Sequence, residues 1–365
     1  MSAPDLDETD EAAVREALRS GVLGLGPFAA RFERLAADLA GVSHGVAVSS
    51  GTSGLHLIVR ALGIGEADEV LVPSFTFAAS ANALLFEGAT PVFVDIEPDT
   101  YNLDPADIER KVTEFTKGVM VVDVFGHPAE WDDIEAVAAR HGLKLIDDCC
   151  EAIGAAYRGR PVGSFKGAGC FAFYPNKQMT TGEGGMIVTD DGELAAACRS
   201  MRNQGRSETG LWLEHERLGF NYRMDEMSAA LGVSQIVRLP EFLRKRAAVA
   251  ERYTEMLARY PWVRTPMVRP HVEMSWFVYV ITLAEGVERD DVISRMGSEG
   301  VPTRAYFSPL HLQPYIRKRF GDLRGTLPVT ESIARRTLAL PFHNNLSEEH
   351  AERVVKALAD AVIAQ

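Results

Sequence analysis

The sequence has little cysteine and no pairing pattern for what it has. Only four cysteines occur in 365 residues, Cys149, Cys150, Cys170 and Cys198, and no two are spaced as CxxC. This usage argues against a zinc site and against a disulfide scaffold. It favours a reducing compartment, so we expect a cytoplasmic protein without a bound metal ion.

Long apolar runs and basic blocks are also missing. No stretch is long enough to span a bilayer, and the start, MSAPDLDETDEAAVREAL, lacks the apolar core of a signal peptide. The net charge is −13, from 38 basic and 51 acidic residues. We therefore expect neither a membrane nor a nucleic acid as partner. An anionic ligand must be held by a local site, because an acidic surface does not attract it.

Short apolar strands alternate with helical patterns along the first half of the chain. This alternation predicts an α/β fold with a mostly parallel sheet sandwiched by helices. Near-continuous apolar strands fit burial on both faces. The predicted strands are 45–50, 69–74, 90–96, 118–126, 143–148, 170–175 and 184–191, and the predicted helices are 11–19, 28–40, 52–63, 77–88 and 131–142.

The second half of the chain has a different organisation. Residues 224–260 read as a long helix, and a smaller α/β unit follows, with strands at 276–283 and 303–307 and helices at 290–300 and 347–364. We predict a large domain at 1–240, with an N-terminal helical arm, and a small C-terminal domain at 241–365.

One lysine stands out in CFAFYPNKQMTTGEGG, residues 170–185. Lys177 lies between an aromatic strand and a run of small residues, and burial disfavours the charged form of lysine. Two interpretations are open. The amine can extend to water, as is usual for a single lysine, or it can be kept reactive, as a Schiff-base lysine must be.

Other unusual residues follow strand ends, where parallel sheets bind ligands. SSGTSG, residues 49–54, joins a strand to a helix, so Gly51, Thr52 and Ser53 are candidates for an anion cradle or for a simple N-cap. The segment has neither Walker nor GxGxxG spacing, which disfavours a nicotinamide-dependent oxidoreductase.

Two further strand ends carry a carboxylate and an aromatic ring. Asp147 and Asp148 face opposite sides of their strand, so one of them points toward a ligand or caps a turn. Phe77 either stacks on a flat ring or fills core. An anion cradle, an aromatic face, a carboxylate and a lysine together suit pyridoxal 5'-phosphate (PLP).

The motifs resemble those of the DegT/DnrJ/EryC1/StrS family of PLP-dependent sugar aminotransferases. The resemblance runs from LGLGPFAARFE to LALPFHNNLSEE and includes SSGTSGLHL, VPSFTFAASANA, IDDCCEAIGA, FYPNKQMTTGEGG and GFNYRMDEMSAALG. It implies PLP fold type I, with a seven-stranded type of sheet and a smaller C-terminal domain. It also implies an obligate homodimer.

The resemblance assigns roles to individual residues. Lys177 corresponds to the Schiff-base lysine, and Asp148 to the partner of the pyridine nitrogen. Phe77 corresponds to the stacking aromatic residue. Gly51, Thr52 and Ser53 correspond to the phosphate cradle, and Asn221 to an asparagine that reaches the phosphate in the neighbouring subunit.

Two positions depart from the family pattern. Ala172 stands where the family often has a phosphate-binding serine, so one donor is missing. Glu151 stands where the family often has histidine or glutamine near the cofactor. Glu151 is therefore a second carboxylate near the ring, with an open role. Arg223, Arg304, Tyr306 and His311 are candidates for contacts with substrate.

The expected activity is transfer of an amino group from L-glutamate to a keto-sugar, with a nucleotide-linked 4-keto-6-deoxy or 3-keto sugar as first candidate. A keto-cyclitol aminotransferase, a PLP-dependent sugar dehydratase and a PLP-binding regulator without turnover are the alternatives. Dehydratases of the family replace the lysine with histidine, so Lys177 argues against that activity. A regulator would carry a basic DNA-binding extension, for which the sequence offers no candidate.

Overall fold

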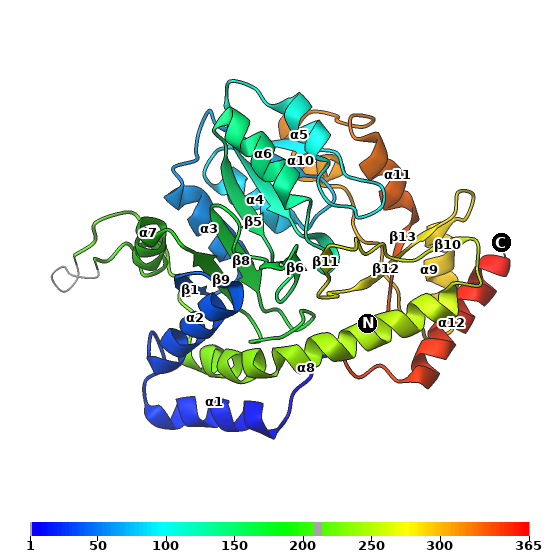
Figure 1. Ribbon diagram of the computed structural model, residues 1–365, viewed down its shortest axis with the longest axis horizontal. Coiled ribbons are helices and arrows are strands. Elements are labelled where there is room, and N and C mark those ends of the chain that lie inside the picture. Colours follow the sequence, from blue (N-terminus) through cyan, green and yellow to red (C-terminus); the bar gives the residue numbers. More distant parts are fainter. Residues whose placement is uncertain (1, 208–213, 365) are drawn as a thin grey trace.

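A seven-stranded sheet forms the centre of the computed structural model, which describes residues 2–207 and 214–364 (Figure 1). Strand β9 is antiparallel to β1 and β8, and all other neighbouring strands are parallel. This mostly parallel sheet confirms the predicted fold class. In spatial order the strands are β1 (His44–Val48), β9 (Gly185–Thr189), β8 (Ala168–Ala172), β5 (Lys144–Asp148), β4 (Thr116–Val122), β2 (Glu69–Pro73) and β3 (Thr90–Val94).

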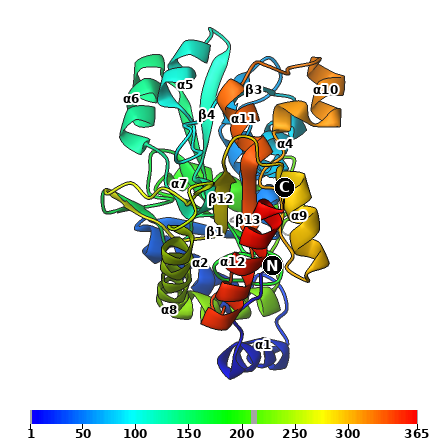
Figure 2. The same ribbon diagram turned by 90° about the vertical axis from the view of Figure 1, so that its right-hand side faces the viewer.

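The sheet is buried on both faces because successive side chains point to opposite sides. On β2, Val70 and Val72 enter one apolar core and Leu71 enters the other. Figure 2 shows α5 and α6 on one side of β4, with α4 and α10 on the other. The core that contains Leu71 includes α2 (Pro27–Ala40), α5 (Pro105–Lys111), α6 (Trp131–His141) and part of α8 (Glu226–Leu257). The core that contains Val70 and Val72 includes α3 (Gly51–Ala61), α4 (Ala78–Phe86), α7 (Gly192–Arg202) and α10 (Pro314–Phe320).

A smaller antiparallel sheet forms around the far end of α8. That helix has 32 residues and continues through Pro240, so the predicted domain boundary lies within it and stays a prediction. The elements here are β10 (Val263–Arg264), β12 (Tyr279–Leu283), β13 (Thr337–Leu340), α9 (Arg289–Ser298), α11 (Pro328–Arg336) and α12 (Glu348–Ile363). A third sheet joins β11 (Val272–Glu273), β6 (Ala156–Tyr157) and β7 (Arg160–Pro161).

The predicted strand at 303–307 is wrong. Arg304 makes only an isolated bridge to Ala339, and β13 is the strand that pairs with β12. Pro302 and Pro309 flank the predicted segment and offer no N–H to a ladder. The apolar β13 is fully buried, pairs with β12 and meets this segment only at the Arg304 bridge.

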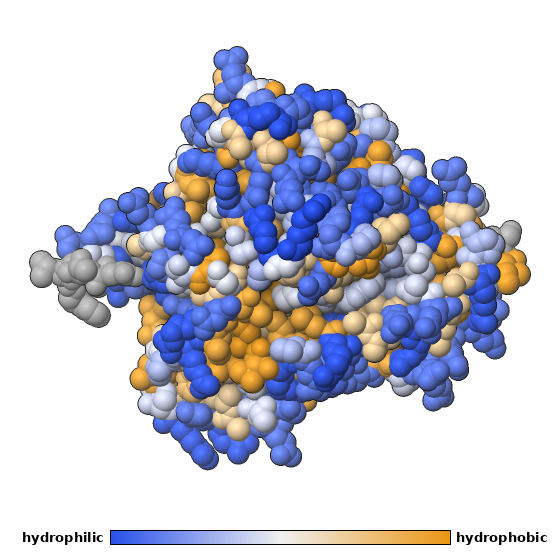
Figure 3. Space-filling view, viewed as in Figure 1, coloured by the Kyte–Doolittle hydropathy of each residue, from blue (hydrophilic) through white to orange (hydrophobic). Residues whose placement is uncertain are grey.

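One face of the molecule carries a concentrated apolar area. Figure 3 shows apolar side chains gathered around α2 and the adjoining part of α8, while hydrophilic residues cover much of the surrounding surface. Val237 of α8 is 65% exposed. Of the helices within the described residues, none is long and apolar enough to cross a membrane.

Glu226, at the start of α8, holds the N-terminus of α2. Its carboxylate accepts hydrogen bonds from the backbone N–H groups of Gly26, Phe28 and Ala29 at 3.0, 2.8 and 2.9 Å. These N–H groups have no partner within their own helix. Glu226 therefore acts as an N-cap supplied from 198 residues away in the sequence.

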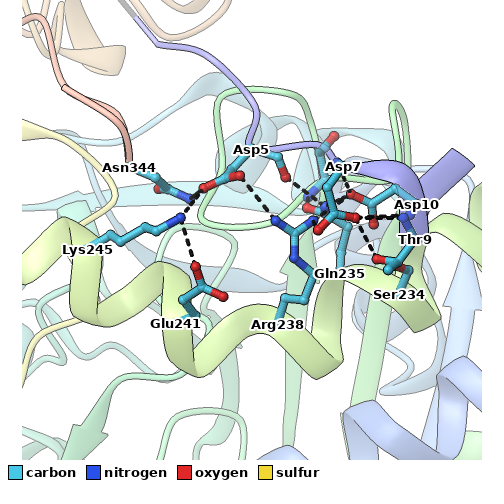
Figure 4. A network of polar contacts seen from close by, with 11 residues as sticks. Asp5, Asp7, Thr9, Asp10, Ser234, Gln235, Arg238, Glu241, Lys245 and Asn344 are labelled. Atoms are coloured by element: carbon cyan, nitrogen blue, oxygen red, sulfur yellow. Dashed lines mark hydrogen bonds and ion pairs between the residues drawn. The ribbon is translucent and has the colours of Figure 1, made fainter. Parts of the chain in front are cut away.

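The N-terminal arm lies along α8 through a network of ion pairs (Figure 4). The arm comprises the first residues and α1 (Glu8–Ser20). Carboxylates of Asp5, Asp7 and Asp10 lie 3.2, 3.0 and 2.8 Å from the Arg238 guanidinium. Lys245 binds Asp5 at 3.1 Å. Because Asp10 is only 3% exposed, its charge depends on these protein partners.

Arg238→Ala should destabilise the attachment of the arm. Removing one partner of a buried ion pair costs about 3 kcal/mol, because the carboxylate of Asp10 stays buried. Urea unfolding and limited proteolysis within residues 1–20 measure the effect. Arg15→Ala is the control, since its 3.9 Å pair with Glu11 is exposed and contributes about 0.3–0.5 kcal/mol. Equal effects of the two variants would contradict the role assigned to Arg238.

Candidate active site

A cavity of about 610 Å³ opens where the large sheet meets segment 305–307. Strands β2, β4, β5 and β8 are parallel, so their carboxyl ends meet at one edge. The lining comes from these strand ends, from the N-terminus of α3 and from the β8–β9 connection. It consists of Ser50, Gly51, Thr52, Thr76, Phe77, Ala79, Val122, Asp148, Cys150, Glu151, Ala172, Tyr174, Asn176, Lys177, Glu183, Gly184, Phe277, Ala305, Tyr306 and Phe307.

Lys177 points into this cavity from the turn after β8. Its side chain is 13% exposed, and Nζ lies 3.7 Å from Oε1 of Glu151. The same nitrogen lies 4.0 Å from the ring centroid of Phe277, a cation–π contact. The backbone of the turn is fixed as well, because Arg246 donates a hydrogen bond to the Lys177 carbonyl at 3.0 Å. The amine is therefore held within the cavity.

Asp148 is the carboxylate that faces the cavity, whereas Asp147 lies on the opposite face of β5. Asp148 is 5% exposed. Its Oδ2 accepts a 2.6 Å hydrogen bond from the Ser80 hydroxyl, and its Oδ1 accepts a 3.3 Å bond from the Cys150 N–H. The carboxylate is thus oriented from the α4 side, and it adds negative charge to the cavity wall.

Glu151 lies deeper, beside the lysine. Oε2 accepts a hydrogen bond from the Phe125 N–H at 3.0 Å. Burial raises the pKa of Glu151, against the opposing effect of the Lys177 charge. Tyr306 lines the same cavity, and burial, together with the charge of Glu151, raises the pKa of its hydroxyl. Acidic and basic groups therefore lie within reach of one bound molecule.

The N-terminus of α3 forms another wall of the cavity. Ser50 is its N-cap, and Gly51 and Thr52 line the cavity. The hydroxyl of Ser53 is engaged in the capping box: it donates to the Ser50 carbonyl at 2.8 Å and accepts from the Ser50 N–H at 3.0 Å. Ser53 is not among the lining residues. The predicted cap is thus formed by Ser50 and Ser53, while the use of Gly51 and Thr52 as an anion cradle stays a prediction.

Of the remaining predicted residues, one lines the cavity and the others lie outside its lining. Phe77 lines the cavity as the N-cap of α4 and is 65% exposed. Asn221 is exposed outside the cavity lining, and Arg223 donates to the side chain of Asn203 at 3.0 Å. Arg304 lies just outside the lining and is also exposed.

His311 is placed away from the cavity, within the fold. It is fully buried, with Nδ1 2.6 Å from the Ser74 hydroxyl and Nε2 3.2 Å from Glu331. Burial lowers its pKa. These contacts give His311 a structural role in joining the segment around η2 (Leu310–Leu312) to the end of β2.

Four supporting residues were not identified from the sequence. Ser80 orients Asp148, and Phe277 packs against the lysine amine. Arg246 holds the lysine turn, and Gln178 donates to the Glu151 carbonyl at 2.6 Å. Only Ser80 had a local signal, because it follows Phe77 by three residues on the helix that starts at the strand end.

Comparison with known proteins identifies the family of the chain. Residues 4–359 match the profile of the DegT/DnrJ/EryC1/StrS aminotransferase family. The chain belongs to this family. GDP-perosamine synthase of Caulobacter vibrioides is 39% identical to it, over 100% of this chain and 98% of the relative. Spore coat polysaccharide biosynthesis protein SpsC of Bacillus subtilis is 37% identical, over 99% and 96%.

Solved structures agree with this assignment to the aminotransferase family. DesV of S. venezuelae superposes with a TM-score of 0.91 at 36% identity, over 96% of this chain and 93% of that chain. A putative sugar aminotransferase of Streptococcus pneumoniae, solved in its PLP form, gives a TM-score of 0.94 at 27% identity, over 100% and 98%. The chain is a PLP-dependent transaminase, and its relatives include sugar aminotransferases.

The residues of the cavity fit this cofactor. One cavity combines an amine, a carboxylate, an aromatic side chain and a helix N-terminus. These are the groups that suit an aldehyde, a pyridine nitrogen, a flat ring and a phosphate, respectively. The cavity volume also lies within the range of about 300–1,000 Å³ that is typical of small-molecule sites.

Gly51→Ala should weaken PLP binding. A Cβ at this position would lie 2.7 Å from the Ala172 Cβ and 2.9 Å from the Cys150 Sγ, so the start of α3 must shift. Overpacking costs about 1–3 kcal/mol, which corresponds to about tenfold or more in the dissociation constant if it falls on the site. PLP titration followed by fluorescence measures this constant.

The matched control is Gly297→Ala, also within a helix, where an added Cβ meets nothing within 4 Å. This variant should bind PLP like the parent protein. Unchanged PLP binding in Gly51→Ala would show that the α3 terminus is not part of the cofactor site.

Proposed function

We propose that this chain transfers an amino group from L-glutamate to a nucleotide-linked keto-sugar, a 4-keto-6-deoxy or 3-keto sugar, in amino-sugar biosynthesis. The observation that carries the proposal is the position of Lys177 Nζ, in one cavity with Asp148 and the α3 N-terminus. The 39% identity to a GDP-perosamine synthase over the whole chain supports a nucleotide sugar as acceptor.

In the proposed reaction, Lys177 is the group that moves the proton. Bound PLP supplies the electron sink that makes the α-carbon of the amino donor acidic. Lys177 Nζ removes that proton, and in the second half-reaction it returns a proton to the carbon that receives the amino group. The Phe277 ring and Glu151 keep the amine in place for both transfers.

Asp148 stabilises positive charge at the far end of the cofactor site, as the proposed partner of the pyridine nitrogen. Its hydrogen bond from Ser80 fixes one carboxylate oxygen and leaves the other less strongly engaged. Phe77 covers a face of the ring. Gly51 and Thr52 offer backbone N–H groups, and Thr52 a hydroxyl, to the phosphate.

Glu151 and Tyr306 are the proposed groups next to the reacting atoms. Glu151 is suited to bind the oxygen beside the aldehyde carbon, because burial raises the pKa of this carboxyl group and so favours a form that can donate a hydrogen bond. Arg223 and Arg304 stay candidates for the diphosphate or the donor carboxylate. The buried contacts of His311 argue against direct substrate binding by that residue.

We also propose a homodimer in which Asn221 contacts the phosphate in the neighbouring site. Asn221 is exposed outside the cavity lining of its own chain, which leaves its side chain available to a second subunit. Phe77 and Tyr174, both at the cavity, are 65% and 53% exposed. Exposed apolar surface of this kind is typical of interaction sites. The cytoplasmic location stays a prediction that accords with four free cysteines.

One alternative acceptor has a specific observation in its favour. A 3-amino-5-hydroxybenzoic acid synthase gives a TM-score of 0.93 at 28% identity, so the fold also serves a protein whose named product is not a sugar. A keto-cyclitol is the corresponding alternative substrate. A dehydratase is disfavoured because Lys177 is present in the cavity.

An absorption experiment tests the proposal. The PLP-loaded protein should show a visible band that L-glutamate removes, and a nucleotide-linked 4-keto-6-deoxy sugar should restore it. A GDP-linked sugar is tested first, followed by other nucleotide sugars and keto-cyclitols. Lys177→Ala should lose turnover by several orders of magnitude, because no other group at the site replaces the proton transfer. Lys177→Arg is the control that keeps the charge without the reactive amine.

Each of three results would refute part of this proposal. Turnover of Lys177→Ala without added amine would exclude Lys177 as the proton-transfer group. A band that L-glutamate leaves unchanged would exclude this donor. Restoration of the visible band by a keto-cyclitol but by no nucleotide sugar would show that the acceptor is a keto-cyclitol.

Ala172→Ser should strengthen PLP binding. Ala172 lines the cavity at the end of β8, where the proposed phosphate site lacks one hydroxyl donor. A hydrogen bond to a charged group contributes about 1.5 kcal/mol, or roughly tenfold in affinity. Equilibrium PLP titration measures the gain, and Ala172→Val is the control that adds volume without a donor. Equal affinities of the serine variant and the parent protein would place the phosphate away from Ala172.

A further inference from the structure

Two carboxyl groups lie behind the cavity, on the opposite face of the sheet from Asp148. In the β4–β5 ladder, Val121 pairs with Asp147 and Val122 with Asp148. Val122 and Asp148 line the cavity. Since side chains alternate along a strand, Asp147 points to the other face. Asp123, two residues after Val121, lies next to it on that face.

Neither carboxyl group is solvated, and each has one oxygen bound by the protein. Asp123 is 0% exposed and Asp147 2% exposed. Oδ1 of Asp123 accepts hydrogen bonds from the Ala129 N–H at 2.8 Å and the Trp131 Nε1–H at 3.1 Å. Oδ2 of Asp147 accepts a bond from the Gly163 N–H at 2.8 Å.

The second oxygen of each group, Oδ2 of Asp123 and Oδ1 of Asp147, is buried without a donor. Two ionised carboxylates cannot satisfy each other, because both offer only acceptors. One proton between them satisfies both oxygens at once. It also reduces the buried charge of the pair from two to one.

We propose that Asp123 and Asp147 share one proton and act as a positioning pair for Asp148. The shared proton ties the end of β4 to β5 directly behind the residue that faces the cavity. The backbone supports the same link, since the Asp123 N–H donates to the Asp148 carbonyl at 3.3 Å. The effect on the cofactor rests on the proposed role of Asp148.

The surroundings of the pair favour keeping the proton. Burial raises the pKa of Asp123 to about 7 and raises that of Asp147 well above its ordinary value. The other titratable groups that act on the pair are the charge of Asp148, across the sheet, and the buried thiol of Cys149. The described lysines, arginines and histidines form no ion pair with either carboxyl group. The described residues also contain no cluster of three ligands that would hold a metal ion in place of the proton.

The pair gives stability a definite dependence on pH. A carboxyl group whose pKa is raised in the folded state stabilises the protein fully below its unfolded pKa, and this contribution is lost as pH rises through the folded value. The melting temperature of the PLP-loaded protein should therefore fall as pH rises from about 4 through about 7, by an amount on the order of 2–4 °C from this pair. PLP should also dissociate faster at the higher pH.

Asp123→Asn and Asp147→Asn test the shared proton directly. In either variant the amide oxygen keeps the existing acceptor role, and the amide Nδ2–H replaces the shared proton at any pH. Each single variant should lose this pH-dependent fall in melting temperature and keep PLP at about pH 8.5. The double Asn variant should melt lower at every pH, because two amide donors then face each other. Asp290→Asn, at an 83% exposed side chain, is the control.

Infrared spectroscopy provides a readout that does not depend on the cofactor. The parent protein should show the carbonyl stretch of a protonated carboxyl group at about pH 6, and both single variants should lack it. Single variants that retain the parent's pH dependence would overturn the proposal. A melting temperature that rises with pH would also overturn it, because that slope means that the folded state binds fewer protons than the unfolded state. Single variants that lose the pH-dependent fall in melting temperature but release PLP with the parent's pH dependence would refute the link to Asp148. They would leave the shared proton intact.

Discussion

The parallel pairing of β2, β4, β5 and β8 is the constraint on which the cavity depends. Parallel strands bring their carboxyl ends to the same edge, and each end contributes a different chemical group. Phe77 follows β2, Asp148 ends β5, and Lys177 follows β8. The chemistry of the site is therefore assembled from distant segments, with no contiguous motif that could hold PLP alone.

Arg246 connects this edge of the sheet to the smaller unit. It is buried on α8 and donates to the carbonyls of Lys177, Trp276 and Phe277 at 3.0–3.1 Å. Burial lowers the pKa of its guanidinium to about 10, so the group stays charged at neutral pH. One side chain thereby fixes both the lysine turn and the ring against which the lysine amine packs. A shift of α8 would be transmitted directly to the position of Nζ.

Much of the fold could be predicted because the strands are apolar on both faces and helices separate them. The sequence also predicted that only one of Asp147 and Asp148 points toward a ligand, since neighbouring side chains on β5 face opposite sides of the sheet. Contacts across long sequence distances were not accessible. The role of Arg246 depends on how α8 packs against the lysine turn, and nothing local to the residue in the sequence indicates this. Ser53 was assigned to the phosphate because its motif fits, but its hydroxyl is committed to the capping box with Ser50. The segment 303–307 has the composition of a strand, but it is flanked by two prolines and its pairing with β13 is limited to the single bridge at Arg304.

The cap that Glu226 provides for α2 also constrains the order of events during synthesis. Residues 26–29 leave the ribosome about 200 residues before their acceptor does, as the separations of 197 to 200 in these hydrogen bonds require. The Arg238 contacts of the arm close loops of similar length. The nascent chain through β5 therefore leaves the ribosome while its N-terminus is still undocked, and the arm can dock on α8 only as a late step.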